Sequence, residues 1–181
     1  PECGLPPDVR NVVMPPPSQP APAQQRRFVA VTADDPRAQP LLDELAVEYA
    51  QRYESTTQTV MAWLTSVPTA DFAPPDGGFL IGEVDGVPVT GGAFQRFDVQ
   101  TAELKRIWTD RAHRRHGHAR ALLVELENLI AERGYRRVYL TTGHRQPEAE
   151  ALYESTGYTR LPEPLPARGP VFPIAFLKTL S

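Results

Sequence analysis

The residues with the clearest chemical potential are a basic run around one glycine, RAHRRHGHAR, from Arg111 to Arg120. An apolar periodic segment follows at once, which places the run at the start of a helix. The first helical turn leaves about four backbone N–H groups unbonded and carries roughly half a positive charge. Gly117 has no side chain to keep a phosphate away from that turn. The stretch therefore predicts an anion site, although many helices also begin this way without a ligand.

Basic charge is concentrated around this predicted site. The 181 residues carry a net charge of −3, whereas the segment from Lys105 to Arg120 holds six lysines and arginines against one acid, Asp110. Such a focused charge on an acidic remainder suits a small anionic ligand. Nucleic acids require an extended basic face, usually with interleaved aromatic residues, and the sequence offers neither. We therefore expect no nucleic-acid partner.

A helix over 117–133 would position the basic run. Its apolar residues recur at the i, i+3, i+4 spacing of a helix with one buried face. It ends in a basic residue followed by Gly134, which can adopt a left-handed cap. The β-rich segments 102–109 and 136–142 lie on either side. The sequence thus predicts a strand–helix–strand unit with the basic run at its first turn.

The other segments predict a mixed α/β fold. Two β-rich runs within 77–98 flank Asp85-Gly86, a strong signal for a two-residue hairpin. An antiparallel hairpin that leads into a strand–helix–strand unit indicates a mixed sheet with helices packed on it. The further expected elements are a strand at 28–32, helices through 38–53, 57–64 and 147–156, and a β-rich C-terminal segment, 171–180.

The first 25 residues differ in composition from the rest of the chain. They contain eight of the twenty prolines, which favours extended, solvated backbone. We interpret 1–25 as a proline-rich N-terminal arm and 26–181 as one domain. The arm could lie on the domain or reach a neighbouring subunit, so a homodimer is an open expectation.

Composition argues against a membrane-spanning or disulfide-stabilised protein. With 41% hydrophobic residues, the chain is an ordinary globular one, and no run approaches the roughly 18 apolar residues that span a bilayer. The single cysteine, Cys3, cannot form an intrachain disulfide, which is typical of a reducing compartment. No charged and apolar leader follows Pro1. We expect a cytoplasmic protein without a membrane partner.

Two motifs refine the interpretation of the basic run. The sequence RRHGHA, 114–119, follows a predicted strand and opens a predicted helix. It resembles the acetyl-coenzyme A signature R/Q-x-x-G-x-G/A of the GNAT superfamily of acyltransferases. The sequence EAEALYESTGY, 148–158, resembles the A-x-x-L-Y-x-x-x-G-F/Y pattern of the family's fourth helix. The resemblance covers roughly 27–178 and is strongest over 102–160.

The resemblance implies a fold and a cofactor. The expected fold is a mixed, mostly antiparallel sheet with helices on both faces, in which the fourth and fifth strands splay apart. The pantetheine arm of acetyl-CoA would enter that gap along the fourth strand, and the pyrophosphate would bind the amides at the helix start. The implied cofactor-binding residues are Ile107, Trp108, Thr109, Arg114, Arg115, Gly117, His118, Ala119 and Arg120. Gln146 completes the set, although many members carry an asparagine there.

Acyl transfer from a thioester to an amine needs a neutral nucleophile and a proton for the departing thiolate. The resemblance implies Tyr153 as the acid, because a phenol remains protonated at neutral pH. It implies Glu103 as the base, since histone-type members place a catalytic glutamate 11 residues before the signature arginine, here Arg114. Two alternatives stay open. Tyr153 could be a packed aromatic, and Glu103 could form only an ion pair with Lys105.

The histidines His113, His116 and His118 also invite a metal hypothesis. No carboxylate or cysteine lies beside them at a ligand spacing, and we expect His116 and His118 to point in different directions around the helix start. We therefore predict no metal. His144, just after the fifth strand, could approach the acyl end but is more often a loop residue.

Two functions fit these observations. The first is an acetyl-CoA-dependent N-acetyltransferase whose acceptor is a primary amine on a small molecule or a protein. The alternative is a non-catalytic acyl-CoA sensor or partner-binding module with the same fold. The acceptor and the size of the acyl group are left open, because Glu48, Glu83 and Asp98 could each attract an amine or face water.

Overall fold

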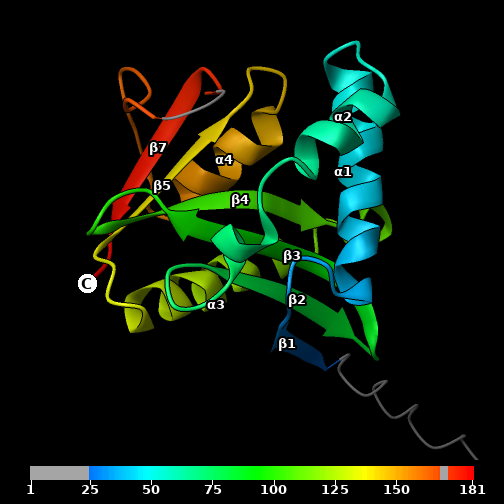
Figure 1. Ribbon diagram of the computed structural model, residues 1–181, viewed down its shortest axis with the longest axis horizontal. Coiled ribbons are helices and arrows are strands. Elements are labelled where there is room, and N and C mark those ends of the chain that lie inside the picture. The colour runs from blue at the N-terminus through cyan, green and yellow to red at the C-terminus, as the bar shows by residue number, and fades with distance from the viewer. Residues whose placement is uncertain (1–24, 168–170) are drawn as a thin grey trace, which may run out of the picture.

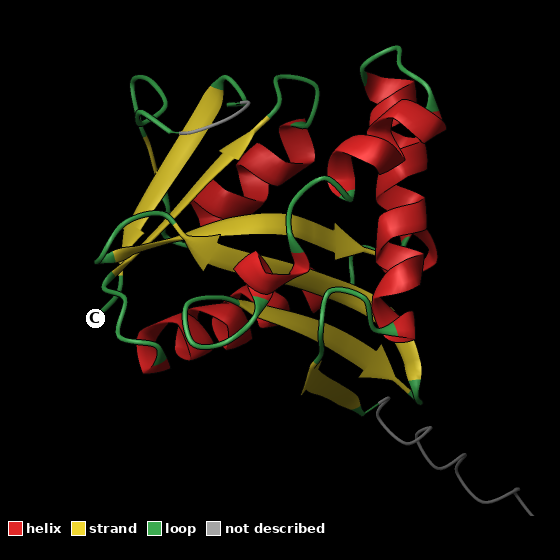
Figure 2. Cartoon of the chain, in the orientation of Figure 1, coloured by secondary structure: helices red, strands yellow, loops and turns green. Residues whose placement is uncertain are grey.

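A computed structural model describes residues 25–167 and 171–181, so nearly all of the proline-rich arm lies outside the described residues. Figures 1 and 2 show a twisted sheet with helices packed on it. The strands are β1 (Arg26–Ala30), β2 (Gly78–Val84), β3 (Val87–Arg96), β4 (Thr101–Thr109), β5 (Arg137–Thr142), β6 (Thr159–Arg160) and β7 (Ile174–Thr179). The α-helices are α1 (Gln39–Arg52), α2 (Thr57–Leu64), α3 (His118–Glu132) and α4 (Pro147–Ser155). Short 3₁₀ helices are η1 (Pro36–Ala38), η2 (Thr69–Phe72) and η3 (Arg111–His113).

The described strands form one sheet in the order β1-β2-β3-β4-β5-β7-β6. All neighbouring pairs are antiparallel except β4 and β5, which are parallel. Asp85 and Gly86, both with positive φ, connect β2 and β3 as the hairpin signal predicted. The predicted elements agree with the observed ones to within about two residues at most ends, and the mixed sheet is confirmed.

Helices cover both faces of this sheet. On one face, α3 and α4 enclose a core that includes Leu122, Leu126 and Phe176. On the other face, α1, α2 and η2 enclose a second core that includes Leu41 and Phe72. Burying apolar side chains on both faces explains why β2 is buried along its whole length. The part of the chain that the structure describes contains no helix long and apolar enough to cross a membrane.

Strand β4 contains a β-bulge that determines which core each of its later side chains enters. Ala93 pairs with Lys105 and Gly91 pairs with Trp108, so β4 has one more residue than β3 between these pairs. Arg106 lies in this bulge with a φ of 59°. In a regular strand Leu104 and Trp108 would face the same side, but here Leu104 belongs to the α3 core and Trp108 to the α1 core.

Strands β4 and β5 separate soon after they begin. They pair at only three positions, which end with Glu103 opposite Tyr139, and β4 then continues for six residues without a β5 partner. In Figure 1, β5 and β7 run at a clear angle to β4, with α1 and α4 on either side of the opening. The predicted splay of the fourth and fifth strands is therefore confirmed. The backbone edge of β4 that faces the gap is left available to a ligand.

Candidate active site

The start of α3 has the features of an anion site. Gly117 precedes the helix with a φ of 76°, and a Cβ built on it would meet nothing within 4 Å. Arg115 also has a positive φ, 65°, which is uncommon for a residue with a side chain. Within the described chain, the backbone N–H groups from Arg115 to Arg120 have no hydrogen-bond acceptor. An exposed turn with free N–H donors and no Cβ fits a phosphate group.

The three arginines predicted to reach phosphate differ in their contacts. Arg114 Nη2 donates to Glu48 Oε2 at 2.7 Å, and its Nε donates to the carbonyl of Thr109 at 3.2 Å. Arg120 Nη2 donates to the hydroxyl of Ser155 at 2.8 Å. Arg115 is exposed and has no side-chain partner among residues 25–167 and 171–181. It is therefore the arginine whose guanidinium is most available to a phosphate.

His118 is available to a ligand through its backbone rather than its ring. Its side chain is 7% exposed, and Nδ1 accepts a hydrogen bond from Arg26 Nε at 2.9 Å. Burial and, to a lesser degree, the Arg26 charge lower the pKa of this imidazole, so the ring is neutral at pH 7. The N–H of His118, at the first position of α3, remains free to donate to an anion.

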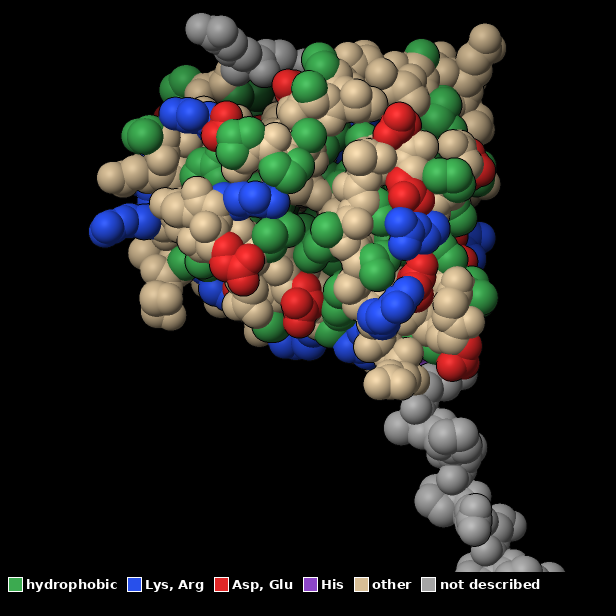
Figure 3. Space-filling view, turned by 60° about the horizontal axis from the view of Figure 1, so that its bottom comes forward, with side chains coloured by type: hydrophobic (Ala, Val, Ile, Leu, Met, Phe, Trp, Pro, Cys, Tyr) green, Lys and Arg blue, Asp and Glu red, His purple; other side chains and the backbone are tan. Residues whose placement is uncertain are grey.

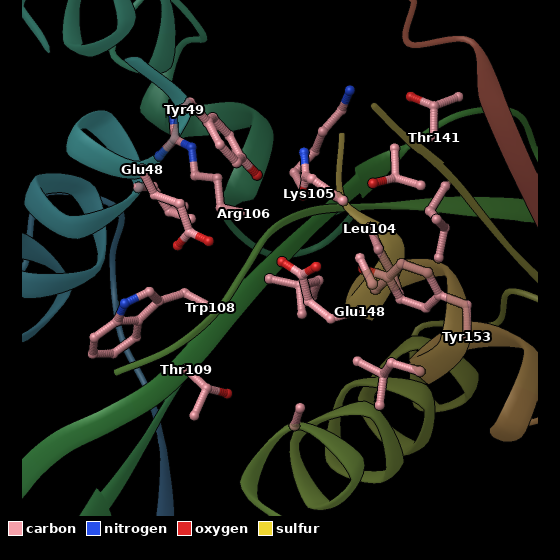
Figure 4. Close-up of a pocket in the computed structure, with 18 of the residues that line it drawn as sticks. Glu48, Tyr49, Leu104, Lys105, Arg106, Trp108, Thr109, Thr141, Glu148 and Tyr153 are labelled. Carbon is pink, nitrogen blue, oxygen red and sulfur yellow. The ribbon is translucent and has the colours of Figure 1, made fainter. Parts of the chain in front are cut away.

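A cavity of about 800 Å³ begins at this helix start and continues through the gap between β4 and β5. Ala119 and Gly117 line one end, and Trp63 and Phe172 line the other. Figure 4 shows Glu48 and Tyr49 of α1, Arg106 and Lys105 of β4, Thr141 of β5 and Tyr153 of α4 around the same space. The cavity thus joins the anion site to the opposite, α1 face of the sheet.

All three predicted positions on β4, Ile107, Trp108 and Thr109, line the cavity. The carbonyl of Trp108 already accepts a hydrogen bond from Thr90 Oγ1 at 2.7 Å, and that of Thr109 accepts one from Arg114. The indole of Trp108 is buried against α1. Of the three residues, Ile107 is the one whose carbonyl accepts no hydrogen bond from a side chain of the described residues. Gln146, at the start of α4, also lines the cavity and donates to the Tyr53 hydroxyl at 3.2 Å.

Comparison with known proteins places this geometry in a family. Residues 38–158 match the model of the acetyltransferase (GNAT) family, which is more than half of the chain. The chain belongs to the GNAT family. The matched range contains both motifs and every predicted site residue.

Individual relatives agree with the family match. Human N-acetyltransferase 8 is 33% identical over 81 residues, which are 45% of this chain and about a third, 34%, of the human protein. A GNAT-family acetyltransferase from Staphylococcus aureus has a TM-score of 0.71 at 14% identity, covering 87% of this chain and 100% of that one. The PaiA N-acetyltransferase from Thermoplasma acidophilum, solved with coenzyme A, has a TM-score of 0.67 at 13% identity, covering 86% and 99%. At these identities the two structures show the fold alone.

Tyr153, the predicted acid, lies in the wall of the cavity. It is 6% exposed, packs against the rings of Tyr158 and Phe176, and lines the cavity. Its hydroxyl has no hydrogen-bond partner among the described residues, and burial raises its pKa above the ordinary value of a phenol. The hydroxyl is therefore protonated at neutral pH and free to bond a ligand.

Glu103 lies at the edge of the cleft rather than in it. Lys105 Nζ donates to its Oε1 at 2.9 Å, and Gln95 Nε2 donates to its Oε2 at 3.2 Å. Glu103 lines a second hollow near η2, whereas Lys105 lines the main cavity and Gln95 lines both. The ion pair left open by the sequence is thus present, and the role of Glu103 as base stays a prediction that needs a bridging water.

Sequence reasoning missed the α1 wall of the site. Glu48 accepts from Arg52 at 2.6 Å as well as from Arg114, and Arg52 also pairs with Glu148 of α4. Tyr49 lies beside Glu48 in the cavity, and burial followed by the Glu48 charge raises its pKa to about 12. A Glu and an Arg four residues apart indicate only an exposed helical ion pair. Their contacts with Arg114, between η3 and α3, and with Glu148 of α4 depend on the fold.

The three histidines near α3 are neighbours, which corrects the expectation that they diverge. The rings of His116 and His118 lie 6.2 Å apart, as do those of His113 and His118, because the turn before α3 folds back on itself. Asp110 contacts His113 Nδ1 at 2.6 Å. In the described part of the chain, no group of three His, Cys, Asp or Glu side chains is arranged to hold a metal ion. His144 packs against the ring of Tyr53 and does not line the cavity.

Proposed function

We propose that this GNAT protein is an N-acetyltransferase that moves an acetyl group from acetyl-CoA directly to a primary amine. The observation that carries the proposal is one continuous cavity, which begins at the free N–H groups before α3, includes Tyr153 in its lining and ends at Trp63 and Phe172. Phosphate, thioester and acceptor can then occupy its successive parts. A small-molecule acceptor fits this enclosed space more readily than a folded protein does.

Coenzyme A fits the residues that line this cavity. The N–H groups of Arg115 to Arg120 would hold the pyrophosphate, the exposed guanidinium of Arg115 would neutralise its charge, and the free edge of β4 at Ile107 would bond the pantetheine arm. Acetyl-CoA supplies the activated thioester. The Thermoplasma acidophilum relative, with coenzyme A bound, supports the assignment. On the face seen in Figure 3, basic side chains alternate with acidic ones, which also favours a small anion over a nucleic acid.

The reaction requires the loss of protons from the amine and the gain of one by sulfur. An alkyl ammonium has a pKa of about 10.4, so it must be deprotonated before its nitrogen can attack the thioester carbonyl. Glu103 would accept that proton through water. As the C–S bond breaks, the Tyr153 hydroxyl would donate a proton to the thiolate.

The proposal is tested in two steps. Calorimetry measures whether the protein binds CoA, and an assay for free thiol then measures acetyl-CoA turnover with a panel of primary amines. We expect binding together with thiol release for at least one amine. Binding without release for any amine would instead identify a non-catalytic acyl-CoA sensor, and a failure to bind CoA would contradict both assignments.

Replacing Glu103 with glutamine tests its role as the base. We expect kcat/KM to fall by about tenfold at pH 7 and the defect to shrink toward pH 9, where more of the amine is already neutral. The measurement is the pH profile of kcat/KM with the best amine. Glu83→Gln is the matched control, since Glu83 is a buried, ion-paired acid on β2. A defect of equal size at every pH would show that Glu103 only holds Lys105 in place.

A further inference from the structure

The cavity contains more positive than negative charge. Its charged lining residues are two carboxylates, Glu48 and Glu148, and six cations, Arg52, Lys105, Arg106, Arg114, Arg115 and Arg120. Arg52 and Arg114 are neutralised by the two carboxylates, and Lys105 is neutralised by Glu103. Arg115 and Arg120 flank the predicted phosphate site at the start of α3. The remaining cation is Arg106, which lies on β4 away from that site.

Arg106 is held in the acceptor half of the cavity by contacts that leave its charge uncompensated. It is half-buried, it lies over the ring of Phe72 with 4.6 Å from Cζ to the ring centroid, and Nη2 donates to the carbonyl of Leu64 at the end of α2. No carboxylate pairs with it among the described residues. Burial lowers the pKa of the guanidinium, although an arginine remains charged at neutral pH. Of the five N–H donors of Arg106, one forms a hydrogen bond within residues 25–167 and 171–181.

Aromatic side chains surround the same end of the cavity. Trp63 and Phe172 meet edge to face at 5.6 Å between ring centroids, and Tyr49 lies 6.4 Å from Trp63. Trp63 is 36% exposed, which is unusual for such a large apolar residue and is explained here by its position in the cavity wall. A partly buried cation beside an open aromatic wall is complementary to a ligand that carries both an anion and an apolar group.

We propose that the acceptor is an α-amino acid with a large apolar side chain, whose carboxylate pairs with Arg106 and whose side chain packs against Trp63 and Phe172. This inference rests on the proposed N-acetyltransferase function and specifies its substrate. Arginine binds a carboxylate through two parallel N–H···O bonds, which would fix the orientation of the amino acid. The α-amine would then be directed toward the part of the cavity lined by Lys105 and Tyr153 (Figure 4).

The reaction is balanced for this substrate. The α-ammonium loses one proton to water or to Glu103, and its nitrogen attacks the thioester carbonyl carbon. The C–S bond breaks and sulfur receives a proton from Tyr153. The nitrogen then releases its second proton, which restores the Tyr153 hydroxyl through water. The products are an N-acetyl amino acid and CoA, with one net proton released. The positive charge of Arg106 also favours the first step, because a nearby cation destabilises the ammonium form.

A comparison of two acceptors on the unaltered protein tests the proposal. L-Phenylalanine and L-phenylalaninamide share the ring and the amine, but only the first has a carboxylate. We expect kcat/KM for phenylalanine to be about tenfold higher, as the loss of a charge-assisted pair predicts. The amide has the less basic amine and would otherwise react more readily at neutral pH. An equal or higher value for the amide, or a preference for the polycation spermidine, would overturn the proposal and leave N-acetyl transfer intact.

A binding measurement gives a result even without turnover. Calorimetry with N-acetyl-phenylalanine and its amide, with and without CoA, should show about tenfold tighter binding of the carboxylate. No preference would contradict the role of Arg106, whereas failure of the proposed function would appear separately as absence of CoA binding.

Variants then locate the carboxylate. Arg106→Gln should abolish the preference, so that kcat/KM is about equal for phenylalanine and its amide. Arg106→Lys should retain part of the preference because the charge remains. Arg160→Gln, an exposed arginine on β6 that is ion-paired with Glu150, is the control and should keep the full preference. Circular dichroism checks folding. A preference that survives in folded Arg106→Gln would exclude this residue as the carboxylate partner.

Discussion

Replacement of Tyr153 by phenylalanine is expected to lower kcat by about 100-fold or more and to leave the affinity for acetyl-CoA nearly unchanged. The change removes one hydroxyl and keeps the ring packed against Tyr158 and Phe176. Steady-state kinetics gives kcat, and calorimetry gives the dissociation constant of acetyl-CoA. A loss of both in equal measure would indicate damage to the cavity rather than removal of a catalytic acid.

Two other tyrosines make this experiment specific. Tyr158→Phe is the structural control, because its hydroxyl contacts Glu127 at 2.9 Å and does not line the cavity. Tyr49→Phe tests the competing donor, since Tyr49 does line the cavity. A 100-fold fall in kcat for Tyr49→Phe with a normal kcat for Tyr153→Phe would reassign the acid.

The pKa of Tyr153 also predicts a feature of the pH profile. Burial raises this pKa, so the hydroxyl keeps its proton well beyond pH 9, and a decline in kcat below about pH 10 must come from another group. Burial in the same cavity also raises the pKa of a thiol. The difference in pKa between the Tyr153 hydroxyl, which donates the proton, and the CoA thiol, which forms when sulfur accepts it, is therefore limited.

Replacement of Gly117 by valine is expected to weaken CoA binding by about 10- to 100-fold. The φ of 76° is unfavourable for a β-branched residue, and the new side chain would extend into the open space before α3 where the phosphate is predicted. Calorimetric titration with CoA measures the effect.

Gly134 provides a matched control at the other end of α3. It too has a positive φ, 93°, and open space around a built Cβ. Gly134→Val therefore introduces comparable backbone strain away from the cavity and should bind CoA normally. Equal affinity in the wild type and both variants would place the phosphate elsewhere, and equal weakening in both variants would identify strain as the cause.

Local signals were sufficient to predict α3 and its first turn. The apolar spacing, Gly117 and Gly134 each act within a few residues, and the structure places the helix at His118–Glu132 against a predicted 117–133. The splay of β4 and β5 followed from the resemblance to the family. Nothing in composition or periodicity would have indicated where two parallel strands separate.

Contacts between distant segments were not predictable in the same way. Glu48 contacts Arg114 across 66 positions of sequence. The sequence indicated only that Glu48 could attract an amine or face water, and that Arg114 could bind phosphate. The β-bulge at Arg106 was missed as well, because alternation in 102–109 remains plausible with or without an extra residue. The aromatic wall was not predicted, because Trp63 and Phe172 are far apart in sequence and come into contact only in the folded chain.

Because of the bulge in β4, the residues that pack the two cores differ from the residue that is proposed to bind the acceptor. If Arg106 were deleted, strict alternation along the shortened strand would still direct Leu104 and Ile107 toward α3, and Trp108 toward α1. Arg106 is thus not needed for the alternation of the core side chains, although it contacts Phe72 and Leu64 on the α1 face. If Arg106 binds the acceptor as proposed, removing it would change acceptor preference while both cores keep the same pattern of side chains.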